Sequence, residues 1–195
     1  AREEAVRLAK EYDTVILIGG QNHLQDLEGH DRPDMKLPYA QDELIEEVLD
    51  ANPDTIVVIA SGSPVEMPWI KKAQTLVWHW YAGMEGGTAL AEVLFGKVNP
   101  SGRLPETFPV KHTDCSAHCI GEFPGGESVD YKEGIFVGYR YYDTENVSVL
   151  FPFGYGLSYT EFEMSDMKAE VLREKRADNE EKSVGREERN ADDLM

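Results

Sequence analysis

The sequence predicts an α/β fold in which a mainly parallel sheet is sandwiched by helices. Three apolar runs are continuous rather than alternating, which is typical of strands that are buried on both faces. These runs span 14–18, 55–60 and 75–80. Helical patterns separate them, and strands that alternate with helices favour a parallel sheet. We therefore expect an α/β sandwich domain over residues 1–110.

The first two expected elements are a helix and a buried strand. Apolar residues recur at the i, i+3, i+4, i+7 spacing of an amphipathic helix, namely Ala5, Leu8, Ala9 and Tyr12. The run TVILI at 14–18 follows and predicts the first strand. Gly19 and Gly20 then predict a tight exit from this strand, because glycine lets two backbone segments approach closely.

The second unit repeats this order. Residues 41–51 carry a helical apolar stripe, which is formed by Leu44, Ile45, Val48 and Leu49. Asn52-Pro53-Asp54 ends that helix, since proline cannot continue it. The run TIVVIA at 55–60 predicts the second buried strand.

The third unit begins with the run TLVWHW at 75–80, which predicts a strand. Trp78 and Trp80 fall on one face of it, where we expect them in the core. Residues 88–95 then predict a helix that ends at Gly96, a position suited to positive φ.

After residue 110 the sequence changes to loop-like, aromatic-rich stretches. Residues 111–130 show no periodicity, and the aromatics of 131–143 and 151–162 suggest extended backbone. We expect 111–162 to be a connector that packs on the sandwich domain. Residues 163–195 are expected to start a further domain or to form a disordered, charged tail, because the last stretch has few large apolar residues.

The charge of the chain excludes two classes of partner. Its 195 residues include 37 acidic and 19 basic side chains, a formal charge of −18. This charge would repel nucleic acid and anionic membranes over most of the surface. No apolar run approaches the roughly 20 residues of a membrane span. We therefore expect neither a nucleic-acid nor a membrane partner.

Two features of the sequence bear on the completeness of the chain and on its localisation. The sequence opens without methionine inside an expected helix, which suggests a piece of a longer protein. Cys115 and Cys119 are too few for a disulfide-built fold and favour a reducing, cytoplasmic location over secretion. The sequence otherwise leaves the localisation unknown.

The first strand is followed by an unusually long loop, residues 19–39. Ligands bind beyond the carboxyl ends of parallel strands, where loops of two to six residues are usual, so a longer loop suggests function. Charged side chains are concentrated in it: Asp26, Glu28, His30, Asp31, Arg32 and Asp34. The alternative is a solvated acidic loop in which Asp31 and Arg32 form a local ion pair, and composition leaves both interpretations open.

Ordered motifs run from this loop to the aromatic stretch near residue 160. The first is the string Glu28-Gly29-His30-Asp31-Arg32, followed by Leu37-Pro38 and Gln41. Further motifs are Gly62-Ser63-Pro64-Val65, Met67-Pro68-Trp69, Trp80-Tyr81-Ala82-Gly83, Glu85-Gly86-Gly87, Asn99-Pro100-Ser101-Gly102-Arg103-Leu104-Pro105, Thr107-Phe108-Pro109 and Phe151-Pro152-Phe153-Gly154-Tyr155-Gly156-Leu157-Ser158-Tyr159-Thr160. Together they resemble the second domain of family 3 glycoside hydrolases, especially β-glucosidases, over about residues 1 to 165.

The resemblance implies a catalytic role for the long loop. Family members of this kind retain the anomeric configuration, with an Asp nucleophile from a barrel-like first domain and a Glu acid/base from the α/β sandwich domain. Glu28 matches the acid/base, and Asp31 and Arg32 are expected to support the loop that presents it. No segment resembles the nucleophile's Ser-Asp-Trp neighbourhood, so we expect that residue in an N-terminal barrel domain outside this chain.

The resemblance also implies a reaction and its requirements. We expect hydrolysis of terminal non-reducing β-D-glycosidic bonds by double displacement, with a β-glucoside or oligosaccharide as the substrate. β-Xylosides or other sugars are the nearest alternatives, and no cofactor or metal is expected. A fibronectin-like β domain often follows in the family. Its start is expected after residue 162, although the tail beyond Lys168 does not match that domain.

Other interpretations start from other residues. A non-catalytic carbohydrate-binding or assembly domain would stack sugars on Trp69, Trp78, Trp80 and Tyr81. A nucleotide site at Gly19-Gly20 lacks the three-glycine fingerprint. The ligand types of a zinc site occur at His112, Cys115, His118 and Cys119, but the adjacent His118 and Cys119 give a poor spacing for tetrahedral coordination.

Overall fold

The computed structural model describes residues 1–121 and 123–170. Residues 1–161 form one compact unit, and residues 162–195 belong to a second. Within the second unit, residues 162–170 contain no helix or strand. Most of the stretch where a fibronectin-like β domain is expected to start therefore lies outside the described residues.

The compact unit is built on a parallel sheet of three strands. The strands β1 (Val15–Gly20), β2 (Thr55–Ala60) and β3 (Thr75–Trp78) lie in the order β1-β2-β3. Both neighbouring pairs are parallel, and Ile56 at the centre lies opposite Ile16 on β1 and Thr75 on β3. The predicted α/β fold with a parallel sheet is therefore confirmed.

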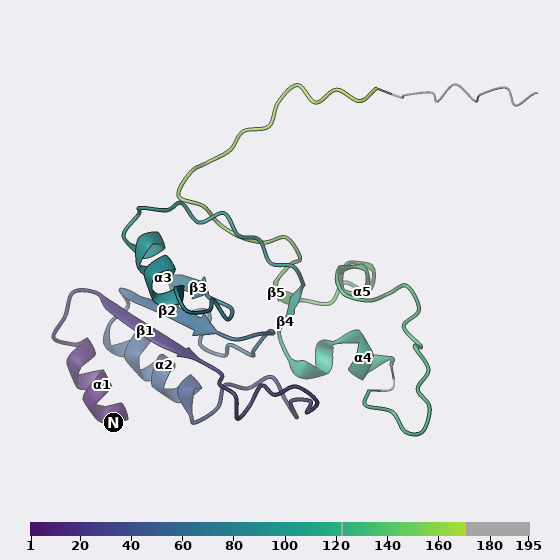
Figure 1. Ribbon diagram of the computed structural model, residues 1–195, viewed down its shortest axis with the longest axis horizontal. Helices are drawn as coiled ribbons and strands as arrows, with labels where there is room; N and C mark the ends of the chain where they lie inside the picture. The colour runs from purple at the N-terminus through teal and green to yellow at the C-terminus, as the bar shows by residue number, and fades with distance from the viewer. Residues whose placement is uncertain (122, 171–195) are drawn as a thin grey trace, which may run out of the picture. The chain divides into compact units, whose positions relative to one another are not determined.

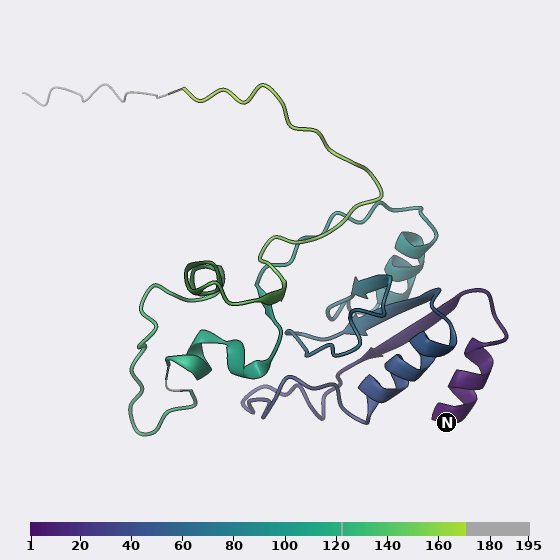
Figure 2. The same ribbon diagram turned by 180° about the vertical axis from the view of Figure 1, so that it is seen from behind.

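Helices lie on both faces of this sheet. Figure 1 and Figure 2 show α1 (Arg2–Ala9) and α2 (Gln41–Ala51) on one face and α3 (Gly86–Leu94) on the other. The apolar stripe predicted for α2 is buried, with Ile45, Val48 and Leu49 facing the protein interior. Within the described ranges, no helix is both long and apolar enough to cross a bilayer.

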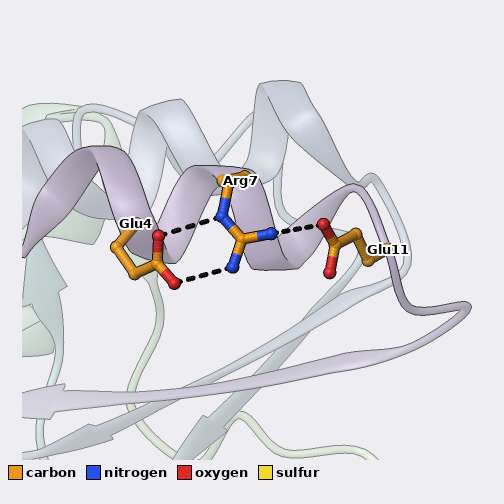
Figure 3. Close-up of polar contacts among 3 residues, drawn as sticks. All are labelled: Glu4, Arg7 and Glu11. Carbon is orange, nitrogen blue, oxygen red and sulfur yellow. Dashed lines mark hydrogen bonds and ion pairs between the residues drawn. The ribbon is translucent and has the colours of Figure 1, made fainter.

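The outer surface of α1 is polar. Arg7 donates to Glu4 from Nε at 2.9 Å and from Nη2 at 2.7 Å, and its third contact is with Glu11 (Figure 3). These are the i, i+3 and i, i+4 neighbours of a helix surface. All three side chains are more than half exposed, so water screens the pairs and limits their contribution to stability.

The core lies around the central strand and α2. On β2, Val57, Val58 and Ile59 are fully buried. The main cluster consists of Leu37, Ile45, Leu49, Val57, Ile59, Val65, Met67, Trp69 and Phe108. Trp69 is 1% exposed, and its Nε1 donates to Asp42 Oδ1 at 2.8 Å, which satisfies the indole N–H inside the core.

The edge strand β1 departs from the expected burial on both faces. Ile16 and Ile18 are 47% and 64% exposed, whereas Leu17 between them packs against the core cluster. Alternate residues of a strand point to opposite faces, so one face of β1 lies open in the described residues. A continuous apolar run indicates that both faces of the strand are apolar. Whether another element covers each face depends on the rest of the fold.

The carboxyl end of β1 is closed by a side chain from α2. Gln41 accepts a hydrogen bond from Gly20 N and donates one to Gly20 O, both at 2.8 Å. A Cβ at Gly20, where φ is 144°, would lie 2.0 Å from the Ala60 carbonyl oxygen. Gly19 and Gly20 therefore lie inside β1 and not at a turn after it, and Gly20 allows the close approach of Ala60. Gln41 satisfies the backbone groups of Gly20 that an edge strand leaves unpaired.

An aromatic cluster joins the sheet to the chain that follows it. The strands β4 (Phe108–Pro109) and β5 (Val149–Phe151) pair antiparallel. Phe108 is fully buried and makes edge contacts with Trp78, Trp80 and Phe151, with ring centroids 4.7, 6.3 and 6.2 Å apart. We call these four residues the aromatic seam. Both tryptophans pack against the core, as predicted.

Two of the motif segments lie side by side beyond the seam (Figure 1). Leu104 N donates to Tyr155 O, and Gly154 N donates to Leu104 O, both at 2.8 Å. Asn99 forms a second joint, since its Oδ1 accepts from Tyr159 N at 2.8 Å and from Ser158 Oγ at 2.9 Å. The segments around 99–105 and 153–160 are therefore joined by backbone and side-chain hydrogen bonds.

Part of the expected connector is helical. Short helices occur at η1 (His112–Asp114) and α4 (Ser116–Cys119), which are too short to give a periodic sequence pattern. The extended backbone expected near residue 140 is wrong, because α5 (Tyr139–Glu145) is a helix. Its buried residues, Tyr141 and Tyr142, are consecutive. A strand would point them to opposite faces, whereas a helix turn keeps both toward the interior.

Candidate active site

Three loops leave the carboxyl edge of the parallel sheet. They follow β1, β2 and β3, and the structure brings side chains from all three together. The sheet edge where parallel strands end is the usual ligand-binding edge of such folds. All three candidate residues, Glu28, Asp31 and Arg32, lie in the first loop. We call residues 21–34 the site loop.

Glu28 lies in a tight turn of the site loop. The turn spans residues 27–30 and is closed by a hydrogen bond from His30 N to Leu27 O at 3.4 Å. Its third residue, Gly29, has φ 78°, which is the conformation that a type II turn requires at this position. Glu28 is exposed, so its carboxyl group faces solvent beyond the sheet edge. The turn explains why glycine follows the glutamate.

Arg32 anchors the site loop on the far side of this turn. Its Nη2 donates to the Pro64 carbonyl oxygen at 2.8 Å, and its Nη1 donates to Gln21 Oε1 at 2.5 Å. Gln21 Oε1 also lies 2.9 Å from Ser61 Oγ on the second loop. Burial lowers the pKa of the Arg32 guanidinium, and the negative charge of Asp26 opposes this shift. The site loop and the loop after β2 are therefore joined by a half-buried cation.

Asp31 is placed differently. Its side chain is exposed, and among the described residues it forms no ion pair with Arg32, whose donors go to Gln21 and Pro64. The local ion pair of the acidic-loop interpretation is therefore wrong. The guanidinium is half-buried and turned toward these two acceptors, while the Asp31 side chain stays in solvent.

A second tether joins the site loop to the loop after β3. The Tyr81 hydroxyl donates to Asp26 Oδ2 at 2.6 Å. Burial raises the pKa of Tyr81, and the hydrogen bond to the Asp26 carboxylate raises it further, so the phenol keeps the proton that it donates. These residues are 55 positions apart, and no local sequence pattern links them. In the sequence, Tyr81 stands out as part of the Trp80-Tyr81-Ala82-Gly83 motif and as a surface for sugar stacking, and neither pattern indicates a contact with Asp26.

The chain that directly follows the site loop is fixed in the core. Met35 and Leu37 are each 6% exposed, and Met35 O accepts a hydrogen bond from Glu66 N at 2.7 Å. Leu27, Glu28 and His30 are exposed in contrast. The site loop therefore has a solvated tip and leads into a buried segment of the core.

The aromatics that suggested a sugar-binding surface are mostly engaged elsewhere. Trp69 is buried with its indole N–H bonded to Asp42, and Trp78 and Trp80 belong to the aromatic seam. Of these four aromatics, Tyr81 is the exposed one, at 53%. This removes most of the support for a binding module built on tryptophan stacking.

The His and Cys residues near 115 do not converge on one point. Cys119 Sγ donates to Thr113 O at 2.7 Å, while the His112 and His118 rings contact each other with centroids 4.0 Å apart. Burial raises the pKa of the Cys115 thiol, which disfavours the thiolate that binds metals. Across residues 1–121 and 123–170, no group of three or more His, Cys, Asp or Glu side chains is placed to hold a metal ion.

A cavity of about 470 Å³ adjoins the site loop. Its lining includes Arg32, Pro64, Glu106, Tyr139 and Phe153. Burial raises the pKa of the Glu106 carboxyl group. Glu28 is not among the lining residues, so the cavity does not enclose Glu28.

A comparison with known protein families identifies the family of this chain. The glycosyl hydrolase family 3 C-terminal domain matches residues 1–159. The chain belongs to glycosyl hydrolase family 3. This confirms the resemblance carried by the ordered motifs, and the matched range contains the site loop, both tethers and the aromatic seam.

Curated members of family 3 are similar over most of this chain. The β-glucosidase BoGH3A of Bacteroides ovatus is 54% identical over 170 residues, which is 84% of this chain and 23% of that protein. The thermostable β-glucosidase B of Acetivibrio thermocellus is 48% identical, over 86% of this chain and 22% of that enzyme. The chain thus spans about a fifth of the length of these relatives.

Solved family 3 structures share the fold. The β-glucosidase of Kluyveromyces marxianus in complex with glucose has a TM-score of 0.82 at 46% identity, over 87% of this chain and 20% of that one. The Bifidobacterium adolescentis GH3 β-glucosidase has a TM-score of 0.76 at 44% identity, over 81% and 23%. The α/β fold of this chain is therefore a family 3 fold.

Proposed function

We propose that this family 3 segment supplies the general acid/base of a retaining β-glucosidase, and that Glu28 is that group. The observation that carries the proposal is the position of Glu28, exposed in a glycine-stabilised turn at the carboxyl edge of the sheet. Support also comes from the relatives, which are named β-glucosidases. The substrate is then a β-D-glucoside with a terminal non-reducing glucose.

The chemistry needs a second carboxyl group from outside this chain. In a retaining glycosidase the two groups lie about 5 to 5.5 Å apart, one attacking the anomeric carbon and the other handling the proton. Protonated Glu28 would donate to the glycosidic oxygen as the leaving group departs. Its carboxylate would then take a proton from the water that hydrolyses the glycosyl-enzyme. The nucleophile is proposed to be an Asp of an N-terminal barrel domain.

Arg32 and Asp31 have unequal parts in this proposal. Arg32 holds the site loop through Pro64 and Gln21 and is a positioning residue. Asp31 is exposed, and its supporting role stays a prediction from the family motif. If Asp31→Ala leaves both the rate and the unfolding temperature unchanged, Asp31 has no such role.

The test uses Glu28→Gln in the full-length protein that contains this chain. Hydrolysis should slow about 10²- to 10⁴-fold for glucosides with poor leaving groups, because these need proton donation. An activated aryl glucoside should be cleaved faster when azide is added. Glu43→Gln, an exposed carboxylate on α2, is the matched control and should behave as the parent protein. An unchanged rate with Glu28→Gln would remove Glu28 from the mechanism.

A further inference from the structure

We propose that Tyr81 is a positioning residue for Glu28, which it holds in place through Asp26. This inference rests on the proposed function of Glu28. The Tyr81 hydroxyl lies 2.6 Å from Asp26 Oδ2, the short distance of a charge-assisted O–H···O bond. Asp26 directly precedes the turn of residues 27–30 that carries Glu28. Fixing Asp26 therefore fixes the point where this turn begins.

The turn is held on both of its sides. Before it, Asp26 is bonded to Tyr81, and after it, Arg32 is bonded to Pro64 and Gln21. The residues of the turn, 27–30, are exposed, so we expect the flanking tethers to be the contacts that set its position. A general acid must come within about 2.6 to 3.2 Å of the atom that it protonates, so two flanking tethers restrict the reach of Glu28 to a narrow range.

The pair of Asp26 and Tyr81 also packs against the loop after β2. A Cβ built at Gly62 would lie 2.8 Å from Asp26 Oδ2 and 2.8 Å from Tyr81 Cε2. The absence of a side chain at this position lets the two groups meet. The site loop therefore depends on a contact in which each of the three loops at the sheet edge takes part.

The backbone before Tyr81 is shaped for this contact. Trp80 has φ 50°, a left-handed conformation that is uncommon for residues other than glycine. Its ring packs edge-on against Trp78 in the aromatic seam, with centroids 5.8 Å apart. The seam therefore holds Trp80 while the chain turns away from the core and delivers the Tyr81 side chain to the site loop.

The experiment compares Tyr81→Phe with the parent in the full-length protein. The ring is kept and the hydroxyl is lost, so kcat/KM should fall about tenfold for glucosides with poor leaving groups and less than about threefold for activated ones, with KM little changed. Tyr159→Phe is the matched control. It removes another exposed hydroxyl, which donates to Val93 O at 2.9 Å, and should change neither value.

Three further variants separate positioning from other roles. Asp26→Ala removes the acceptor and should reproduce the Tyr81→Phe effect, and the double variant should be no worse than either, because both changes break the same contact. Tyr81→Phe should add nothing in a Glu28→Gln background. Amide hydrogen exchange at residues 26–31 should become faster in Tyr81→Phe and stay unchanged in Tyr159→Phe.

The results that would contradict the role of Tyr81 differ from those that would contradict the proposed function of Glu28. If Tyr81→Phe slows all glucosides equally, or still slows the Glu28→Gln protein, Tyr81 does not act through Glu28 and the inference is overturned. If Glu28→Gln itself leaves hydrolysis unchanged, the proposed function fails, and this inference fails with it.

Discussion

The aromatic seam and the site loop keep their residues in place by different means. In the seam, Phe108 is fully buried among three other rings. In the site loop, the tip is exposed and two side-chain tethers, from Arg32 and Tyr81, define its position. Apolar burial is non-directional and contributes mainly to stability, whereas hydrogen bonds are directional and fix geometry. Damage to the seam should therefore act mainly on stability, and damage to the tethers should act mainly on the order of the site loop and on activity, with a smaller loss of stability.

The largest expected effect on stability comes from Phe108→Ala. The change leaves a cavity in the seam and should lower the free energy of unfolding by about 3 to 5 kcal/mol. Urea denaturation of the chain measures this loss. Phe95→Ala removes a ring that is 79% exposed and should change the value by less than about 0.5 kcal/mol. A similar loss in both variants would contradict the distinction between seam and surface.

Arg32→Lys should have an intermediate effect on stability and a large one on the site loop. Lysine keeps the charge but cannot donate along two fixed directions to Pro64 O and Gln21 Oε1. We expect a loss of about 1 to 3 kcal/mol in the free energy of unfolding and faster amide exchange at residues 22–31. Arg140→Lys, at an exposed arginine on α5, is the control. Unchanged exchange in Arg32→Lys would mean that this tether does not order the loop.

The smallest effect on stability is expected at the open face of β1. Ile18→Thr keeps a β-branched residue on a strand position that is 64% exposed, so the free energy of unfolding should change by less than about 0.5 kcal/mol. We expect the chain alone to self-associate through this face and to show no appreciable glycosidase activity without the nucleophile. On a sizing column, Ile18→Thr should elute later than the parent. An identical elution would place the association elsewhere.

Much of the fold could be predicted because it depends on local periodicity. The stripe of α2 and the run of β2 each report burial within one element. The helix α5 could not be predicted in this way, since seven residues with two consecutive buried tyrosines give no repeat. The exposed face of β1 could not be predicted either, because strand order at the sheet edge is a property of the assembled layers.

The candidate site could be predicted only in part, because its contacts join residues that are far apart in the sequence. The family motif points to Glu28 and Arg32, but the acceptors of Arg32 lie 11 and 32 residues away, and Tyr81 lies 55 residues from Asp26. Such pairs depend on which strands are neighbours and on where each loop turns. Single-sequence patterns do not contain that information, and a solvated acidic loop would have the same composition.

The meeting of three loops at Gly62 limits how this enzyme family can be recombined. A designer who grafts only residues 21–34 into a relative would move Asp26 and Arg32 but leave behind Tyr81, Gly62 and Pro64. The transplanted glutamate would then depend on the residues that the recipient carries at these three positions. A segment that is exchanged between relatives should therefore include the loops that follow all three strands. The crossover points then lie within strands or helices and not at the ends of residues 21–34.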